Sequence, residues 1–119
     1  MSEEPPFGEN QIRDVALRFA ADAGDAHPSV IQHVAGPHDL AVKIGSFGNQ
    51  VFDQTWCYLI AVRGSFVFSN VSRPVGAAAP RGTVMVIYLN ARTGAYMGRG
   101  LGDRYPELEQ LGPVTTDLS

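Results

Sequence analysis

Two long β-prone runs constrain the fold of this 119-residue chain more than any other feature. The first spans residues 51–63 and is rich in aromatic and β-branched residues, and the second spans residues 83–90 (TVMVIYLN). Successive side chains of a strand point to opposite faces of a sheet. From Trp56 onward the first run is apolar at both alternating sets of positions, which predicts a central strand covered on at least one side.

An amphipathic helix is predicted ahead of these runs. Asn10 is a good N-cap residue, and Gly24 can end a helix in a left-handed conformation. Between them, apolar residues recur at helical spacing: Ile12, Val15 and Phe19. We therefore expect a helix over about residues 11–23 that buries this stripe against the sheet.

Shorter segments complete the predicted sheet. Residues 30–34 and 40–44 are β-prone and are separated by a turn signal at residues 35–39 (AGPHD), so they predict a hairpin of two short strands. After the second long run, residues 90–94 (NARTG) predict a tight turn, with Gly94 at the position that requires a positive φ.

The order of elements predicts an α+β fold. One N-terminal amphipathic helix packs on a curved antiparallel sheet of about four to five strands, because a helix followed by a meander usually lies across one face of the sheet. Residues 95–101 form the return strand, and residues 106–111 are long enough for one helical turn. The length suits one domain, which we expect over residues 10–114, with flexible tails at residues 1–9 and 115–119.

Charge is unevenly distributed along the chain. The net charge is −3, but residues 1–39 carry −5, residues 40–105 carry +5 and residues 106–119 carry −3. The predicted sheet is therefore basic, and either the acidic ends complement it or it faces an anion. The acidic balance of the whole chain argues against nucleic acid as the main partner. The candidate anion ligands are four arginines: Arg63, Arg92, Arg99 and Arg104.

Cysteine content and hydropathy indicate a cytoplasmic protein without a membrane partner. Cys57 is the only cysteine, so an intramolecular disulfide cannot form and nothing points to an oxidising compartment. The sequence as given opens with no leader-like apolar segment, and no apolar run approaches the roughly 18 residues of a membrane span.

The predicted turn after the second long run reads Ala91-Arg92-Thr93-Gly94. It resembles the terminal hairpin of PepSY-like domains, in which a strand ends in Asp, Ala or Pro, a basic residue, Thr and Gly. Residues 72–82 and 102–108 resemble a group of small uncharacterised actinobacterial proteins, so the resemblance covers about residues 50–114. It implies a helix on a curved sheet related to cystatin-like folds. It also implies binding or restraint of other proteins, with no catalytic residues.

The residues that most often carry chemistry form no recognised motif. The chain contains no G-x-S-x-G, H-E-x-x-H, P-loop or paired C-x-x-C. The G-x-G-x-G of residues 98–102 lacks the next glycine of a dinucleotide fingerprint, and Cys57 lies among apolar residues that favour an inert thiol. Three histidines are spaced six and five residues apart, which suits neither a strand nor a helix metal site: His27, His33 and His38. We expect no metal and no cofactor.

Three functions stay open. The first is a non-enzymatic binding or protein-interaction module, including a dimer formed through the sheet, because the strand aromatics exceed what one helix face can cover. The second is a small enzyme or ligand carrier with a pocket between helix and sheet, into which His33, Asp39 or Asp53 points. The third is anion or nucleic-acid binding by the basic sheet through Arg63, Arg92 and Arg99. The candidate pocket or interface residues are Phe19, Trp56, Tyr58, Arg73 and Arg81.

Overall fold

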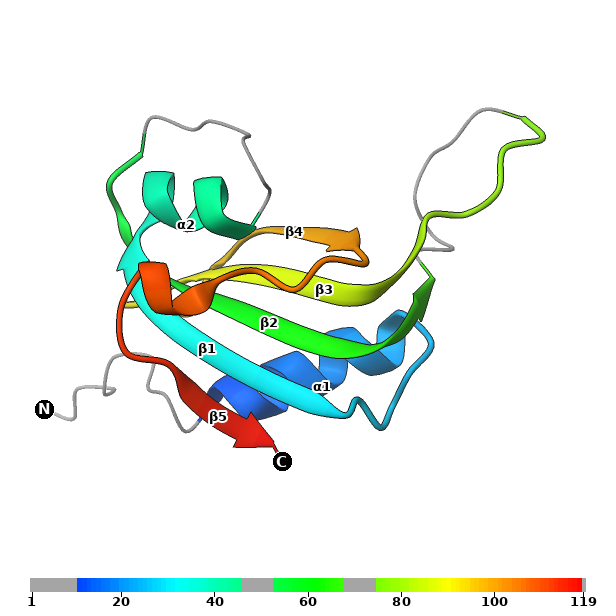
Figure 1. The fold of residues 1–119 in the computed structure, drawn as a ribbon, viewed down its shortest axis with the longest axis horizontal. Helices are drawn as coiled ribbons and strands as arrows, with labels where there is room; N and C mark the ends of the chain where they lie inside the picture. The colour runs from blue at the N-terminus through cyan, green and yellow to red at the C-terminus, as the bar shows by residue number, and fades with distance from the viewer. Residues whose placement is uncertain (1–10, 46–52, 68–74, 119) are drawn as a thin grey trace, which may run out of the picture.

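The computed structural model describes residues 11–45, 53–67 and 75–118. These residues form an α+β fold with two α-helices and an open five-stranded antiparallel sheet in the order β4-β3-β2-β1-β5 (Figure 1). The α+β class and the strand number are as predicted. In chain order the elements are α1 (Ile12–Asp22), β1 (Val30–Pro37), α2 (His38–Gly45), β2 (Trp56–Val67), β3 (Arg81–Asn90), β4 (Tyr96–Gly102), the 3-10 turn η2 (Leu108–Gln110) and β5 (Thr115–Leu118).

Helix α1 is found where the sequence predicts a helix, and it contributes to the first of two buried clusters. Its fully buried side chains are Ile12, Ala16 and Ala20. They belong to one cluster with sheet residues that include Ile31, Ile60 and Ile87. Val15 and Phe19 of the predicted stripe pack at the margin of this cluster and are only partly buried. After the helix, Gly24 takes a φ of 98°, as its predicted role as a stop requires.

Strand β2 is the centre of the sheet and contributes to both faces. It pairs with β1 on one side and β3 on the other. Ile60 and Val62 belong to the cluster that contains α1, whereas Leu59 and Ala61 belong to the second cluster. The register with β3 shifts between Arg63 and Phe66, so the strand continues past Gly64 through an irregularity.

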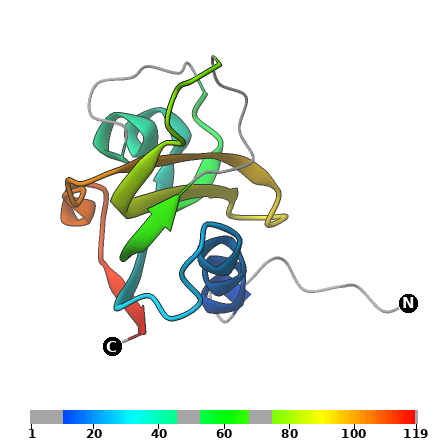
Figure 2. The same cartoon turned by 90° about the vertical axis from the view of Figure 1, so that its right-hand side faces the viewer.

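The second face of the sheet is covered by the chain itself. Ala41 and Val42 of α2 and Leu108 of η2 are buried in one cluster with Leu59 and Tyr88 of the sheet. Figure 2 shows α1 on one side of the sheet and α2 on the other. The strands carry more aromatic residues than one helix face can cover, but α2 and η2 pack on this second face and bury its apolar side chains.

The prediction of a strand over residues 40–44 is wrong, because this segment lies in helix α2. The helix opens with two backbone hydrogen bonds to residues far along the chain, from His38 N–H to the Thr55 carbonyl (2.9 Å) and from Asp39 N–H to the Asp53 carbonyl (2.7 Å). The first amides of a helix have no partner within the helix, so acceptors supplied by the approach to β2 favour helix here. Residues 30–34 lie in β1, which pairs with β2 instead of with residues 40–44.

The prediction of a flexible tail over residues 115–119 is also wrong for residues 115–118. They form β5, which pairs with β1 at the edge of the sheet. Asp117 Oδ2 lies 2.5 Å from Nδ1 of the buried His33, and the Gln32 side-chain amide donates to Thr116 Oγ1 at 3.0 Å. A strand of four residues carries too little periodicity to be recognised in the sequence. Its partners lie more than 80 residues earlier, so no local pattern indicates the pairing. The predicted tail at residues 1–9 lies outside the described residues.

The turn between β3 and β4 confirms its prediction. Gly94 has a φ of 76°, and its N–H donates to the Asn90 carbonyl at 2.8 Å. The Asn90 side-chain oxygen accepts the backbone N–H groups of Arg92 (2.8 Å) and Thr93 (3.1 Å). Among the helices described, none has the length and apolar character needed to cross a membrane.

Candidate ligand groove

An open groove of about 340 Å³ lies between the outer face of α2 and the segment that contains η2. Positions i, i+3 and i+4 of a helix share one face, so α2 contributes three neighbouring side chains to the groove. The other wall comes from the chain after β4. The groove is lined by Leu40, Lys43, Ile44, Arg104, Glu107 and Gln110.

The α2 wall of this groove is apolar with one positive charge. Leu40 is 48% exposed, which is high for a large aliphatic side chain, and Ile44 is half-buried beside it. Lys43 is exposed, and no carboxylate in the described parts of the chain forms an ion pair with it. The wall therefore offers apolar surface and a cation that has not been matched within the described fold.

The opposite wall is fixed by contacts to the sheet. The Tyr105 hydroxyl donates to Gln32 Oε1 at 2.6 Å, and the Arg63 guanidinium lies 4.7 Å from the centre of the Tyr105 ring. Burial raises the pKa of Tyr105 to about 12, against the opposing effect of Arg63, so the hydroxyl stays protonated and remains a donor. Leu108 adds a fully buried anchor. On the surface of this wall the Gln110 side-chain amide donates to Glu107.

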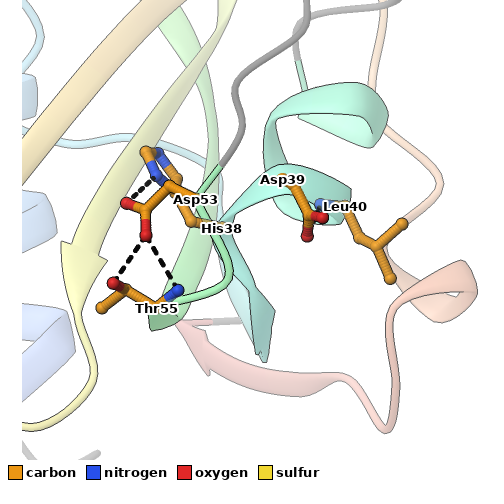
Figure 3. Close-up of polar contacts among 5 residues, drawn as sticks. All are labelled: His38, Asp39, Leu40, Asp53 and Thr55. Carbon is orange, nitrogen blue, oxygen red and sulfur yellow. Dashed lines mark hydrogen bonds and ion pairs between the residues drawn. The ribbon is translucent and has the colours of Figure 1, made fainter.

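A polar cluster anchors the start of α2 (Figure 3). His38 Nδ1 lies 3.0 Å from Asp53 Oδ2, and Asp53 Oδ1 accepts the hydroxyl of Thr55 at 2.6 Å and its backbone N–H at 3.0 Å. The two Thr55 hydrogen bonds, followed by that of His38, lower the pKa of Asp53 to about 2. The His38 ring also meets Tyr88 edge-on at 5.8 Å. Figure 3 shows that Leu40 points away from this cluster.

The His38–Asp53 pair resembles the base-and-orienter part of a nucleophilic site, but the chain's thiol does not suit such a role. Cys57 is fully buried, and burial followed by the charge of Asp53 raises its pKa to about 12. A thiol of that pKa stays protonated and unreactive near neutral pH. The geometry therefore favours a structural clamp between α2 and the approach to β2.

Of the predicted pocket residues, Phe19 and Tyr58 both pack against the first buried cluster, each with a different ring partner. Phe19 stacks on Tyr96 with ring centres 5.5 Å apart, and Tyr58 meets the buried His33 edge-on at 5.6 Å. The first buried cluster lies between α1 and the sheet. Trp56 is 57% exposed. Asp39 uses its carboxylate to accept the N–H of Leu40 at 2.8 Å.

The predicted anion ligands do not converge. Arg63 lies against Tyr105 on the α2 side of the sheet, whereas Arg99 lies over Phe19 on the α1 side, at 5.7 Å from its ring centre. Arg92 is exposed in the β3–β4 turn. A single site cannot use all three, and of the four arginines Arg104 lines the groove. Of the two arginines among the predicted pocket or interface residues, Arg81 is exposed at the start of β3 and Arg73 lies outside the described residues.

A second open cleft, of about 490 Å³, lies at the β2 irregularity. Its carboxylates already serve the fold: Asp25 Oδ2 accepts the Ser65 N–H at 3.0 Å, and Asp103 Oδ1 accepts the Thr83 N–H at 3.1 Å. A Cβ at Gly64 would lie 2.6 Å from Asp25, so the missing side chain makes room for the first contact. In the part of the chain that the structure describes, no group of three or more metal-ligating side chains gathers.

No protein-family model matches the chain, and no curated protein or solved structure matches it significantly. The groove is therefore assigned from its own geometry. Of its lining residues, sequence reasoning had singled out Arg104 alone. The signal that could have found the others is the placement of Leu40, Lys43 and Ile44 at helical spacing, which the expectation of a strand concealed.

Proposed function

We propose that this protein is a non-enzymatic binding module and that the groove between α2 and η2 is its recognition site. The observation that carries the proposal is the exposed Leu40 beside Lys43, which has no ion-pair partner among the described residues, in a groove of about 340 Å³. Ligand sites are concave, largely apolar and equipped with a few placed polar groups, at volumes of roughly 300–1,000 Å³. The volume of the groove lies within this range, and its lining combines the aliphatic Leu40 and Ile44 with polar and charged side chains.

Both walls are held independently of any ligand, which supports a preformed site. The His38–Asp53 clamp holds the start of α2, and the buried Leu108 with the Tyr105–Gln32 hydrogen bond holds the other wall. A ligand that enters a preformed site loses less of its binding energy to ordering the protein.

The strongly perturbed pKa values also favour binding over catalysis. Each has a structural cause: the Thr55 contacts of Asp53, the burial of Cys57 and the burial of Tyr105. None of these three residues lines the groove. Perturbed groups that gather in a cleft would have favoured an enzyme instead.

We also propose a relationship to PepSY-like and cystatin-like domains. It is supported by the order of elements, with α1 before the sheet, and by the resemblance of the β3–β4 hairpin around Gly94. Under this relationship the sheet is curved around α1, and the chain binds a protein or a second copy of itself in addition to the ligand of the groove. A dimer formed through an open sheet face is the less favoured form, since α2 and η2 pack on that face.

The recognition site is tested by mapping small-molecule binding on ¹⁵N-labelled protein. We expect hits from a fragment library to shift the backbone amides of residues 40–44 and 104–110, and Leu40→Ser to weaken those hits. Val75→Ser is the matched control, because Val75 is a fully exposed aliphatic residue outside the groove. A library that shifts no groove amide at millimolar concentration, or hits that bind Leu40→Ser unchanged, would overturn the proposal.

A further inference from the structure

We infer that the groove takes a small free monocarboxylate with a short apolar tail, an inference that rests on the proposed function of the groove. The charges of the lining point to an anion. Lys43 projects from α2 and Arg104 from the opposite wall, and Glu107 is the single acid among the described lining residues. These described residues therefore carry a net charge of +1, in a chain whose overall charge is −3.

The single charge of Glu107 can offset only one of the two positive charges of the described lining. Its carboxylate already accepts the Gln110 side-chain amide on its own wall. Lys43 lies across the groove and has no ion-pair partner within the described segments. A ligand carboxylate placed near Lys43 would gain a charge-assisted hydrogen bond without breaking an internal ion pair of that lysine.

The apolar part of the lining sets the rest of the ligand. Leu40 and Ile44 are four residues apart on α2, so their Cβ atoms lie about 5–6 Å apart on one helix face. Lys43 lies one turn after Leu40 on the same wall, which places a positive charge beside apolar surface. A volume of about 340 Å³ stands near the lower end of the range for ligand sites, so a short alkyl or aryl tail fits better than a long lipid chain.

Three probes with the same six-carbon chain test this assignment: hexanoate, hexylamine and 1-hexanol. We expect hexanoate to shift the amides of residues 40–44 and 104–110, to bind at least about fivefold more tightly than 1-hexanol, and to weaken as sodium chloride rises. Hexylamine should leave these amides unshifted, because its ammonium would face Lys43 and Arg104.

Substitutions separate the charge from the groove itself. Lys43→Gln should lower the hexanoate affinity about three- to tenfold and leave 1-hexanol binding unchanged. Arg92→Gln is the matched control, since Arg92 is exposed in the β3–β4 turn and does not line the groove. The folded state of each variant is checked by its amide spectrum outside the groove.

The outcomes distinguish this inference from the proposed function. Tighter binding of hexylamine or 1-hexanol in the groove would overturn the carboxylate assignment and leave the recognition site standing. A groove that ignores all three probes but binds a leucine-ending peptide would overturn the small-molecule assignment alone. If these probes and the fragment library all fail to reach the groove, the proposed function fails together with the inference.

Discussion

Leu108 fastens the η2 turn to the second face of the sheet, so Leu108→Ala tests whether the chain really covers that face. The side chain is 1% exposed and shares a buried cluster with Leu59, Val86 and Tyr88. Truncating a buried leucine to alanine costs about 2–5 kcal/mol, from lost transfer free energy and the cavity left behind. We expect about 2–3 kcal/mol, because a short turn at the surface can partly collapse into the cavity.

This loss is large beside the roughly 5–15 kcal/mol that stabilises a typical domain, and urea unfolding followed by far-ultraviolet circular dichroism measures it. The matched control is Leu40→Ala, whose exposed side chain should change the free energy of unfolding by no more than about 0.5 kcal/mol. If Leu108→Ala costs no more than the control, η2 does not pack on the sheet and the wall of the groove is not fixed. The reasoning that leads to a preformed site would then be refuted.

Three further predictions follow from buried or closely approached groups. The Cys57 thiol, with its pKa near 12, should react with Ellman's reagent at pH 8 at least about 100-fold more slowly in the native protein than in urea, and similar rates would contradict its burial. Asp53 has its folded-state pKa lowered to about 2, so its stabilising contribution is complete above its usual pKa near 4 and is lost as pH falls through about 2. The difference in unfolding free energy between wild type and Asp53→Asn should therefore shrink from pH 5 to pH 2, and a constant difference would exclude this role. Gly82→Ala should lower the free energy of unfolding by about 1–3 kcal/mol, because the new Cβ would lie 2.5 Å from the Gly102 carbonyl oxygen. In Gly102→Ala the new Cβ points into open space, so the loss should be less than about 1 kcal/mol. Equal losses in urea unfolding would show that the β3 and β4 backbones are not so close.

Local sequence signals were enough wherever the interactions they reflect are themselves local. The α1 helix was predicted because apolar residues repeat at helical spacing and Gly24 ends the run. The β3–β4 turn was predicted because Asn90 and Gly94 are residues that such a turn needs, and the Asn90 side chain does bond within the turn. Both elements are specified by residues within a few positions of one another.

The same local reasoning failed at α2, where it favoured the wrong element. Val42 and Ile44 are β-branched and favour a strand. In the structure the segment is a helix whose buried residues, His38, Ala41, Val42 and Gly45, recur at helical spacing. Its first amides are satisfied by carbonyls of residues 53 and 55, which only the folded chain brings within reach.

The sequence by itself therefore determined the α+β class, the central strands, α1 and the tight turn, because side-chain periodicity and turn chemistry act over short stretches of chain. Tertiary structure alone decided the pairing of β5 with β1, the cover of the second sheet face and the groove. The groove is lined by side chains from residues 40–44 and from residues 104–110, about sixty positions later in the chain. No local sequence pattern indicates that these two segments lie side by side. The charge asymmetry was visible in the sequence. The sequence did not show which arginine lines the groove opposite Lys43. The folded sheet decides this, because it places Arg63 and Arg99 on opposite faces, whereas Arg104 lines the groove beside α2.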